Sequence, residues 1–247
     1  MKPVFLSIQA TYAHVHLALF NKSACCARLS STQARASSHL IPLCMSLLES
    51  QSLHLSDLNF IAIDKGPGAF TSLRVALATV NGIAFAHRIP LIGVDSLDAF
   101  TYDVTAQITA QKIPAYSYIL VLLNAYNNDV YYTLSHLSIA TNAYDLCVKG
   151  CGKIDTVLAM ITKDYAPQEL IETGNGCTQH LDLITASLPK EICVYHHDQA
   201  TPTVDSIGAL GVQQFLTQTS HSYKIEPNYL KSQYFAIAQH PGQKKNS

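Results

Sequence analysis

The stretch "DKGPGAFTSLR", residues 64–74, stands between two apolar segments and decides how the sequence around it is interpreted. Residues 58–65 are typical of a buried strand, and residues 71–87 are typical of a long helix. A glycine-rich turn from a strand into a helix is either a phosphate-binding loop or a structural joint. The first alternative belongs to a nucleotide-using enzyme, and the second belongs to a protein that assists one.

The turn lacks the features of the two common phosphate-binding loops. A Walker loop has a lysine and a hydroxyl after its last glycine, whereas Gly68 is followed by Ala69, Phe70 and Thr71. The dinucleotide pattern GxGxxG also fails, because its third glycine position is Thr71. Pro67 has no N–H to offer a phosphate. The spacing therefore favours a strand-to-helix joint, with Thr71 as the cap of the helix.

Arg74 is an unusual residue for the first turn of a helix. The helix dipole places partial positive charge there, so a cation is disfavoured. We expect a compensating group, which could be an internal carboxylate such as Asp64 or Asp98, a bound anion, or an acidic residue of a partner. The position of Arg74 hints at a recognition surface.

The helix that follows the turn carries a ridge of small side chains. Ala78, Gly82 and Ala86 recur every four residues, so a second helix could approach closely along this ridge. The helix is apolar nearly all round, and so is the segment 40–48. A helix of this kind is either deeply buried or docked against another subunit. In a lobe of this size, docking is the favoured interpretation.

The first part of the chain predicts a mixed sheet with helices against it. The expected elements are strands at 4–10, 15–21, 24–31, 58–65 and 89–96 and helices at 38–50, 71–87 and from 96 onward. Ser37 or Ser38 is expected to cap the helix 38–50, with Pro42 near its first turn, and Ser96 is expected to cap the last helix. Three antiparallel strands followed by βαβ units define this arrangement.

The second part of the chain begins in a similar way. We expect a hairpin of strands 118–126 and 129–137 across the Asn127–Asn128 turn, then a helix near 155–161 and a strand near 169–173. A helix at 204–217 is predicted as well. Two successive units with a similar start indicate a duplicated, two-lobed architecture.

Composition limits the class of protein. The chain has 247 residues, of which 48% are apolar and only 13% charged, so part of the apolar surface is expected to be covered by a partner. The formal net charge of −1 argues against a general nucleic-acid binder. Seven cysteines without a CxxC pair indicate reduced thiols. With no signal peptide and no apolar run of ~20 residues, we expect a cytoplasmic protein without a membrane span.

The sequence offers little for metal or covalent catalysis. Position 9 is glutamine and no carboxylate precedes Glu49, so a metal–phosphate site at the first hairpin would lack its oxygen ligands. His14 and His16 share a strand face, but two histidines alone rarely bind a metal. Cys177 is expected to be a buried structural thiol rather than a nucleophile. We therefore predict no catalytic, cofactor-binding or metal-binding residues.

Residues 64–100 resemble the TsaB family, also called YeaZ, whose hallmark is GPG[SA]FTGLR followed by a helix of small residues and IPLxGVxSL. The residues that carry the resemblance are Gly66, Pro67, Gly68, Phe70, Thr71, Leu73 and Arg74, while Ser72 replaces the usual glycine. Weaker similarity extends along the chain. Residues 37–48 resemble the family's HSExLLP helix without its acid, residues 122–134 resemble DARxxEVYxAxY, and residues 225–232 resemble the closing PxYLR.

The resemblance implies an α/β fold of the two-lobed actin, sugar-kinase and Hsp70 type (ASKHA), with a mixed sheet and flanking helices in each lobe. We expect the first lobe to span residues 1–102, with docking helices at 38–50 and 71–87, and to be completed by residues 203–240. Residues 103–202 are expected to form the second, smaller lobe.

The resemblance also implies a role in making threonylcarbamoyladenosine in tRNA. The family member is a pseudo-enzyme that pairs with the catalytic subunit TsaD, or with a second copy of itself, and the ATPase TsaE then joins the pair. It reaches tRNA only through the complex, and it needs no cofactor and no membrane. The expected pairing residues are His39, Leu40, Leu43, Leu47, Phe70, Thr71, Arg74, Ala78, Gly82 and Ala86.

Two alternatives stay open. The first is an active metal- or nucleotide-dependent hydrolase of the glycoprotease type, which the missing metal ligands oppose. The second is a homodimeric scaffold of divergent function. The departures from the family pattern at Gln9, Ser72, Asn124 and Tyr126 keep the second alternative open.

Overall fold

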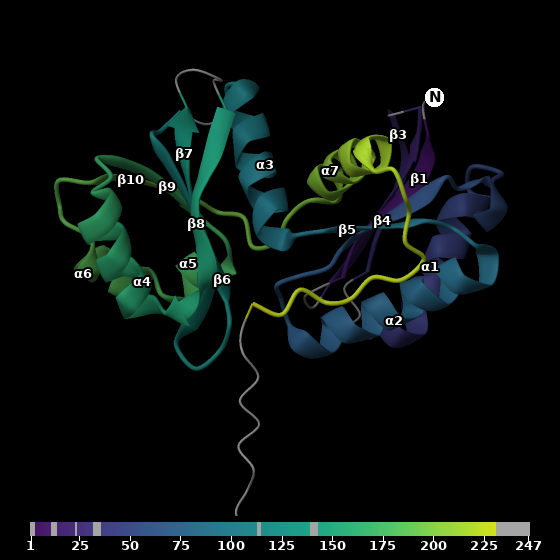
Figure 1. Cartoon of the computed structure of the whole chain (residues 1–247), viewed down its shortest axis with the longest axis horizontal. Coiled ribbons are helices and arrows are strands. Elements are labelled where there is room, and N and C mark those ends of the chain that lie inside the picture. The colour runs from purple at the N-terminus through teal and green to yellow at the C-terminus, as the bar shows by residue number, and fades with distance from the viewer. Residues whose placement is uncertain are drawn as a thin grey trace, which may run out of the picture.

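The computed structural model describes residues 3–10, 14–22, 24–31, 36–112, 115–138 and 143–230, with the backbone alone at residues 36–38 and 70. The chain forms two five-stranded sheets, in the orders β3-β2-β1-β4-β5 and β10-β9-β6-β7-β8. The sheets lie side by side with helices against them, as Figure 1 shows. This arrangement confirms the expected two-lobed α/β fold with a mixed sheet in each lobe.

The first sheet starts with an antiparallel meander, as predicted. Its strands are β1 (Val4–Gln9), β2 (Val15–Asn21), β3 (Ala24–Ser31), β4 (Phe60–Asp64) and β5 (Leu91–Val94). β4 pairs in parallel with β1, and β5 pairs in parallel with β4. Every residue of β4 is buried, because helices cover the sheet on both faces.

Three long helices cover the first sheet, and a short 3-10 turn, η1 (Leu55–Asp57), precedes β4. α1 (Ala36–Glu49) and α2 (Phe70–His87) lie on one face, and α7 (Val204–Thr217) lies on the other (Figure 1). Under α7, the ring of Phe60 stacks between Phe5 and Phe215, with centroid distances of 4.5 Å to each. The aromatic stack fixes α7 on the sheet by a large buried apolar area.

The second sheet repeats the plan of the first. Its strands are β6 (Tyr118–Asn124), β7 (Asp129–Ser138), β8 (Ala143–Lys153), β9 (Glu169–Thr173) and β10 (Cys193–His197). β6, β7 and β8 form an antiparallel meander, and β9 and β10 continue the sheet in parallel beyond β6. The five strands of each sheet have the same order and directions along the chain, so the duplicated architecture expected from the sequence is present.

Helices flank the second sheet as well. α4 (Ile154–Met160), the π-helix η2 (Ile161–Tyr165), α5 (Asn175–Gln179) and α6 (Leu181–Ser187) follow the meander. α3 (Ser96–Thr109) packs against the opposite face, where Leu97, Phe100 and Val104 join a core with β6 and β9. The expected boundary after residue 102 falls inside α3, and the division into lobes stays a prediction. Residues 231–240 of the expected first lobe lie outside the described residues.

The start of α1 differs from the prediction. α1 begins at Ala36, so Ser37 and Ser38 lie inside it rather than at its cap, and Pro42 lies in its middle. Proline removes one backbone hydrogen bond there. The helix continues because Leu40 and Cys44, on both sides of the proline, are buried against the sheet.

The cap residues of α2 and α3 also differ from the prediction. α2 is preceded by Ala69 as its N-cap, so Thr71 is the second helical residue. α3 is capped by the Asp95 carboxylate, which accepts hydrogen bonds from the amides of Leu97 (2.9 Å) and Asp98 (3.3 Å). A carboxylate at this position also suits the helix dipole.

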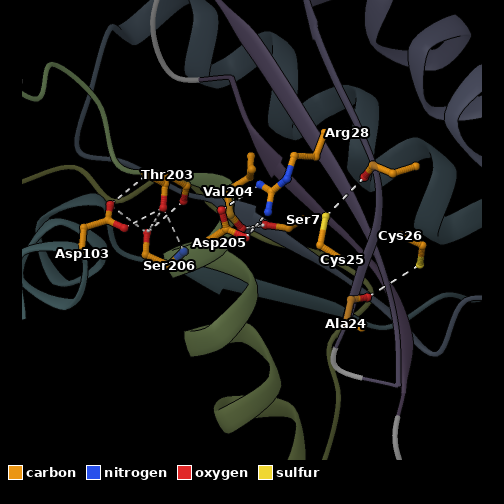
Figure 2. A network of polar contacts seen from close by, with 11 residues as sticks. Ser7, Ala24, Cys25, Cys26, Arg28, Asp103, Thr203, Val204, Asp205 and Ser206 are labelled. Atoms are coloured by element: carbon orange, nitrogen blue, oxygen red, sulfur yellow. Dashed lines mark hydrogen bonds and ion pairs between the residues drawn. The ribbon is translucent and has the colours of Figure 1, made fainter. Parts of the chain in front are cut away.

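The lobes meet where α3 reaches the start of α7 (Figure 2). The Asp103 carboxylate accepts hydrogen bonds from the Thr203 hydroxyl (2.6 Å) and the Ser206 hydroxyl (3.1 Å). On the side of the first sheet, the Ser7 hydroxyl donates to the carbonyl of Val204 at 2.6 Å. The N-terminal turn of α7 is therefore bonded to both lobes.

After α7, residues 218–230 run without helix or strand and are called the strap. The strap passes the edge of the first sheet, where the amide of Leu91 donates to the carbonyl of Ser222 at 2.8 Å. It then crosses toward the second lobe, as the yellow segment of Figure 1 shows. Within the described residues, no helix is long and apolar enough to cross a membrane.

Candidate partner-docking face

The two sides of α2 have different surroundings. Its inner side belongs to the core of the first lobe, together with residues of α1. The shared core includes Leu73, Ala76, Leu77, Val80, Ile83 and Ala84 from α2 and Leu40, Cys44, Leu47 and Leu48 from α1. Its outer side is exposed at Thr71, Arg74, Ala78, Gly82, Phe85 and Ala86, which we call the docking face. The docking face follows the helical period along the full length of α2.

The predicted ridge of small residues lies on this exposed side. Ala78, Gly82 and Ala86 are all exposed, and a Cβ built on Gly82 would meet no atom within 4 Å. The lobe itself therefore does not require glycine at position 82. Beside the ridge, the Phe85 side chain is 84% exposed, which is unusual for a large apolar residue.

The α1 residues of the predicted interface are divided between surface and core. His39 and Leu43 are half-buried, whereas Leu40 and Leu47 are fully buried. Leu40 and Leu47 belong to the lobe's own core, so they are left out of the docking face. The side chain of Phe70, also predicted, lies outside the described residues.

The interface predicted from the sequence did not include two exposed apolar residues. Phe85 follows Ala78 by seven residues and so falls on the same side of α2, and Ile41 of α1 is 49% exposed. Helical spacing could have identified Phe85. The nearly uniform apolar character of α2 concealed which side faces solvent.

Arg74 has a partner that the sequence did not suggest. Its Nε donates to the hydroxyl of Tyr229 at 2.7 Å, and its guanidinium carbon lies 5.5 Å from the centre of the Tyr229 ring. Of the two carboxylates proposed as partners, Asp98 binds the Nζ of Lys149 at 2.5 Å. The other, Asp64, accepts from the Ser96 hydroxyl at 2.5 Å. The Tyr229 contact places an aromatic ring from the strap beside Arg74.

The glycine turn that precedes α2 is bonded to two neighbouring elements. Gly66 has a φ of +92°, and a Cβ there would lie 2.8 Å from Cδ2 of Leu73. Its amide donates to the Asp64 carboxylate at 2.9 Å, and its carbonyl accepts from the amide of Ser96 at 2.9 Å. The turn therefore joins β4, α2 and α3, as expected for a joint.

The second lobe has a glycine turn at the equivalent place, after its own fourth strand. Gly174 has a φ of +101°, and a Cβ there would lie 2.3 Å from the carbonyl oxygen of Leu122. Glycine is required for both reasons. The duplication thus extends to the turn between the parallel strand and the helix of each lobe.

The ends of β1 and β6 supply amides where a magnesium–nucleotide site would need carboxylates. Gln9 ends β1, and Asn124 ends β6. The Asn124 side chain already accepts from the amide of Tyr126 at 2.7 Å, which shapes the β6–β7 hairpin. The described residues contain no group of three or more histidine, cysteine or acidic side chains that could hold a metal. The amides described at the ends of these two strands do not fit a magnesium–nucleotide site.

The cysteines behave as structural or surface thiols. All seven are free. Cys177 is fully buried, its Sγ lies 3.1 Å from the carbonyl of Thr173, and burial raises the pKa of its thiol well above the usual value. A thiol in this environment is a poor nucleophile, as expected from the sequence.

Comparison with known sequences gives consistent matches. A sequence model of the family described as "TsaD: tRNA N6-adenosine threonylcarbamoyltransferase" matches residues 30–233. The protein "tRNA threonylcarbamoyladenosine biosynthesis protein TsaB" of Buchnera aphidicola subsp. Schizaphis graminum is 26% identical over 132 residues, which cover 53% of this chain and 60% of that protein. The protein of the same name from Escherichia coli is 27% identical over 92 residues, 37% of this chain and 40% of that protein. The matched part is less than two thirds of either relative.

Solved structures give a longer match. A Pseudomonas aeruginosa protein described as similar to peptidase YEAZ superimposes with a TM-score of 0.73 and 19% identity, over 93% of this chain and 100% of that chain. YeaZ from Pseudomonas aeruginosa superimposes with a TM-score of 0.69 and 18% identity, over 92% and 100%. At these identities the likeness establishes the fold.

Proposed function

This chain belongs to the family of tRNA N6-adenosine threonylcarbamoyltransferase (TsaD) as a relative of its TsaB (YeaZ) members, and from that premise we propose that it is a non-catalytic subunit of the machinery that makes threonylcarbamoyladenosine in tRNA. In this proposal it binds and activates a catalytic TsaD subunit, and the ATPase TsaE joins the pair. Contact with tRNA is made only through the complex. The place of action is the cytoplasm.

The exposed side of α2 is the observation that carries this proposal. Phe85 is 84% exposed and stands beside the open ridge around Gly82, so a partner helix could approach closely and cover the ring. TsaD is a member of the same family and would present a related pair of helices to this face. A large apolar residue next to small ones suits the centre of such an interface.

The residues at the ends of β1 and β6 support a non-catalytic role. Gln9 and Asn124 are amides, and the Gly66 amide is already bonded to Asp64, so the glycine turn has few donors to offer a phosphate. The hydrolase alternative would need oxygen ligands from elsewhere. We therefore expect calorimetry of the isolated protein to show no micromolar, magnesium-dependent ATP binding, and such binding would favour the hydrolase.

Partner binding and complementation test the proposal together. The wild-type chain should co-purify with the TsaD protein of its own organism and restore threonylcarbamoyladenosine in cells that lack their TsaB. Phe85→Asp should abolish both, because a charge would be desolvated within the interface. The control is Leu216→Asp, since Leu216 is 61% exposed on α7, on the opposite face of the first sheet.

The outcomes separate the alternatives. A wild-type chain that forms only homodimers and does not restore the modification would favour the scaffold of divergent function. A Phe85→Asp variant that binds TsaD as well as the Leu216→Asp control would rule out the docking face as the site of contact.

A further inference from the structure

The strap is fixed along α2 by a side chain of that helix. The Asn81 side chain accepts from the amide of Ile225 at 2.8 Å through Oδ1 and donates to the carbonyl of the same residue at 3.0 Å through Nδ2. One amide side chain thus satisfies both backbone groups of Ile225, as a neighbouring strand would do. The irregular segment is therefore held without a secondary structure of its own.

Apolar packing adds to this attachment. Ile225 is half-buried against the core of the first lobe. Its Cγ2 lies 3.0 Å from where a Cβ of Gly93 would be, so the absence of a side chain in β5 leaves room for it. The strap is packed into the lobe at this point rather than lying over it.

Further along, the strap crosses the glycine joint. The amide of Asn228 donates to the carbonyl of Lys65 at 2.9 Å, and its Nδ2 donates to the Asp95 carboxylate at 2.6 Å. Asp95 also caps α3 and lies 3.1 Å from the Nζ of Lys149 in β8. Asn228 therefore bonds to the chain just before the glycine turn and to the residue that caps α3.

The strap ends at the docking face. Tyr229 is 46% exposed and holds Arg74 through the 2.7 Å hydrogen bond and the face of its ring. The next residue, Leu230, packs against the core between α3 and the second sheet. The strap therefore contacts the core of each lobe, and between these contacts it touches the exposed first turn of α2.

We propose that the strap positions α2 for docking, and that Tyr229 extends the docking face so that the partner contacts its ring together with Arg74. This inference rests on the proposed function, because the partner is the TsaD-type subunit. Asn81, Asn228 and Tyr229 are positioning residues for the docking helix. Loss of their contacts loosens the first three turns of α2 and weakens partner binding.

Two variants and one control test this inference. Tyr229→Ala removes both the hydroxyl and the ring, while Tyr229→Phe keeps the ring over Arg74 and should retain part of the effect. Asn81→Ala releases Ile225 from the middle of the helix. The control is Tyr223→Phe, because Tyr223 is 49% exposed on the same strap and its hydroxyl has no hydrogen bond to any described residue.

Hydrogen exchange of the isolated protein is the first measurement, since it needs no partner. Amides of residues 73–81 should exchange about fivefold faster in Tyr229→Ala and Asn81→Ala than in wild type, as expected when about one hydrogen bond is lost. The dissociation constant for TsaD, measured by calorimetry, should rise by about fivefold or more in Tyr229→Ala and by less in Tyr229→Phe.

The two measurements test separate parts of the proposal. If exchange in α2 is the same in wild type and both alanine variants, the positioning role is wrong. If Tyr229→Ala binds TsaD as tightly as the Tyr223→Phe control, Tyr229 is not part of the docking face. If the wild-type chain does not bind TsaD at all, the proposed function fails, while the exchange data still decide the positioning role.

Discussion

The Asp103 carboxylate accepts both the hydroxyl and the amide of Thr203, at 2.6 Å and 2.8 Å, across 100 residues of sequence. It also accepts from Gln199 at 2.9 Å and from Ser206 at 3.1 Å. One buried carboxylate in α3 thus receives four hydrogen bonds from the chain that enters α7. Figure 2 shows those from Thr203 and Ser206. The contact between the two lobes depends on this acceptor.

Asp103→Asn should destabilise the protein by about 1–3 kcal/mol, because an NH₂ group would face donors and leave at least one of them unsatisfied. Urea unfolding measures the change. Asp205→Asn is the control on the same helix: Asp205 pairs with Arg28 at 2.7 Å, but both side chains are half exposed. The control should lose under about 1 kcal/mol. Equal losses of unfolding free energy in the two variants would contradict the importance of the Asp103 hydrogen bonds between the lobes.

Gly82→Leu should leave the monomer folded and weaken association with TsaD by about 2 kcal/mol, because a large side chain would stand at the centre of the interface. The open space around Gly82 and a gain in helix propensity of up to about 1 kcal/mol both favour a folded variant. Thermal unfolding and calorimetric binding are measured on the same sample.

Gly211→Leu is the matched control for that substitution. Gly211 is also a helical glycine, but a Cβ there would lie 2.6 Å from Cβ of Ala62 in the sheet. This variant should lose about 1–3 kcal/mol of stability or more. An unfolded Gly82→Leu, or a folded one that binds TsaD normally, would refute the assignment of the ridge to an interface.

Glu172 should make the stability of the protein depend on pH. This residue is 2% exposed in β9, and burial raises the pKa of its carboxyl, although the hydrogen bond from His196 at 3.1 Å opposes the shift. Because the folded-state pKa lies above the ordinary value of 4.5, the folded state binds the proton more tightly than the unfolded state. The contribution of Glu172 to stability is therefore full below that value and is lost as pH rises through the folded-state pKa.

Glu172→Gln removes this titration. Relative to the variant, the wild type should lose unfolding free energy between mildly acidic and neutral pH. Urea unfolding of both proteins across this range measures the difference. A difference that grows in favour of the wild type as pH rises would show that the pKa of Glu172 is lowered instead.

Five of the seven cysteines should separate into an early and a protected group when the native protein reacts with iodoacetamide. Cys26, Cys147 and Cys193 are exposed and should be alkylated first. Cys44 and Cys177 should be protected, because burial raises the pKa of Cys44 to about 12 and that of Cys177 well above its usual value. Mass spectrometry of peptides after timed quenching gives the order. Early labelling of Cys177 would contradict its buried position, and denaturant should make all seven reactive.

The sequence predicted those elements that have a regular apolar pattern. The first meander was predicted correctly, and α7 occupies the predicted residues with Thr203 as its cap. β8 and β10 were missed because they lack a regular apolar alternation. Their residues are mostly half-buried or exposed, so polar residues and glycines interrupt the alternation of a buried strand.

The docking face could be predicted from the sequence only in part, for a related reason. Helical spacing placed Ala78, Gly82 and Ala86 on one side of α2, and the structure exposes that side. Spacing could not show that Leu40 and Leu47 of α1 face inward, because that depends on how α1 and α2 pack on each other. The contact of Tyr229 with Arg74 joins residues 155 positions apart, and no local pattern encodes it.

The position of α7 has a consequence for how the protein is made. The face of the first sheet that carries Phe5 and Phe60 is covered by residues 204–217, which are synthesised after the whole second sheet. During synthesis, the aromatic face of the first sheet therefore stays exposed to solvent until α7 has been made. The second sheet lies within residues 118–197, so its strands can pair before α7 is available. The lobe that leaves the exit tunnel first is the last to finish folding.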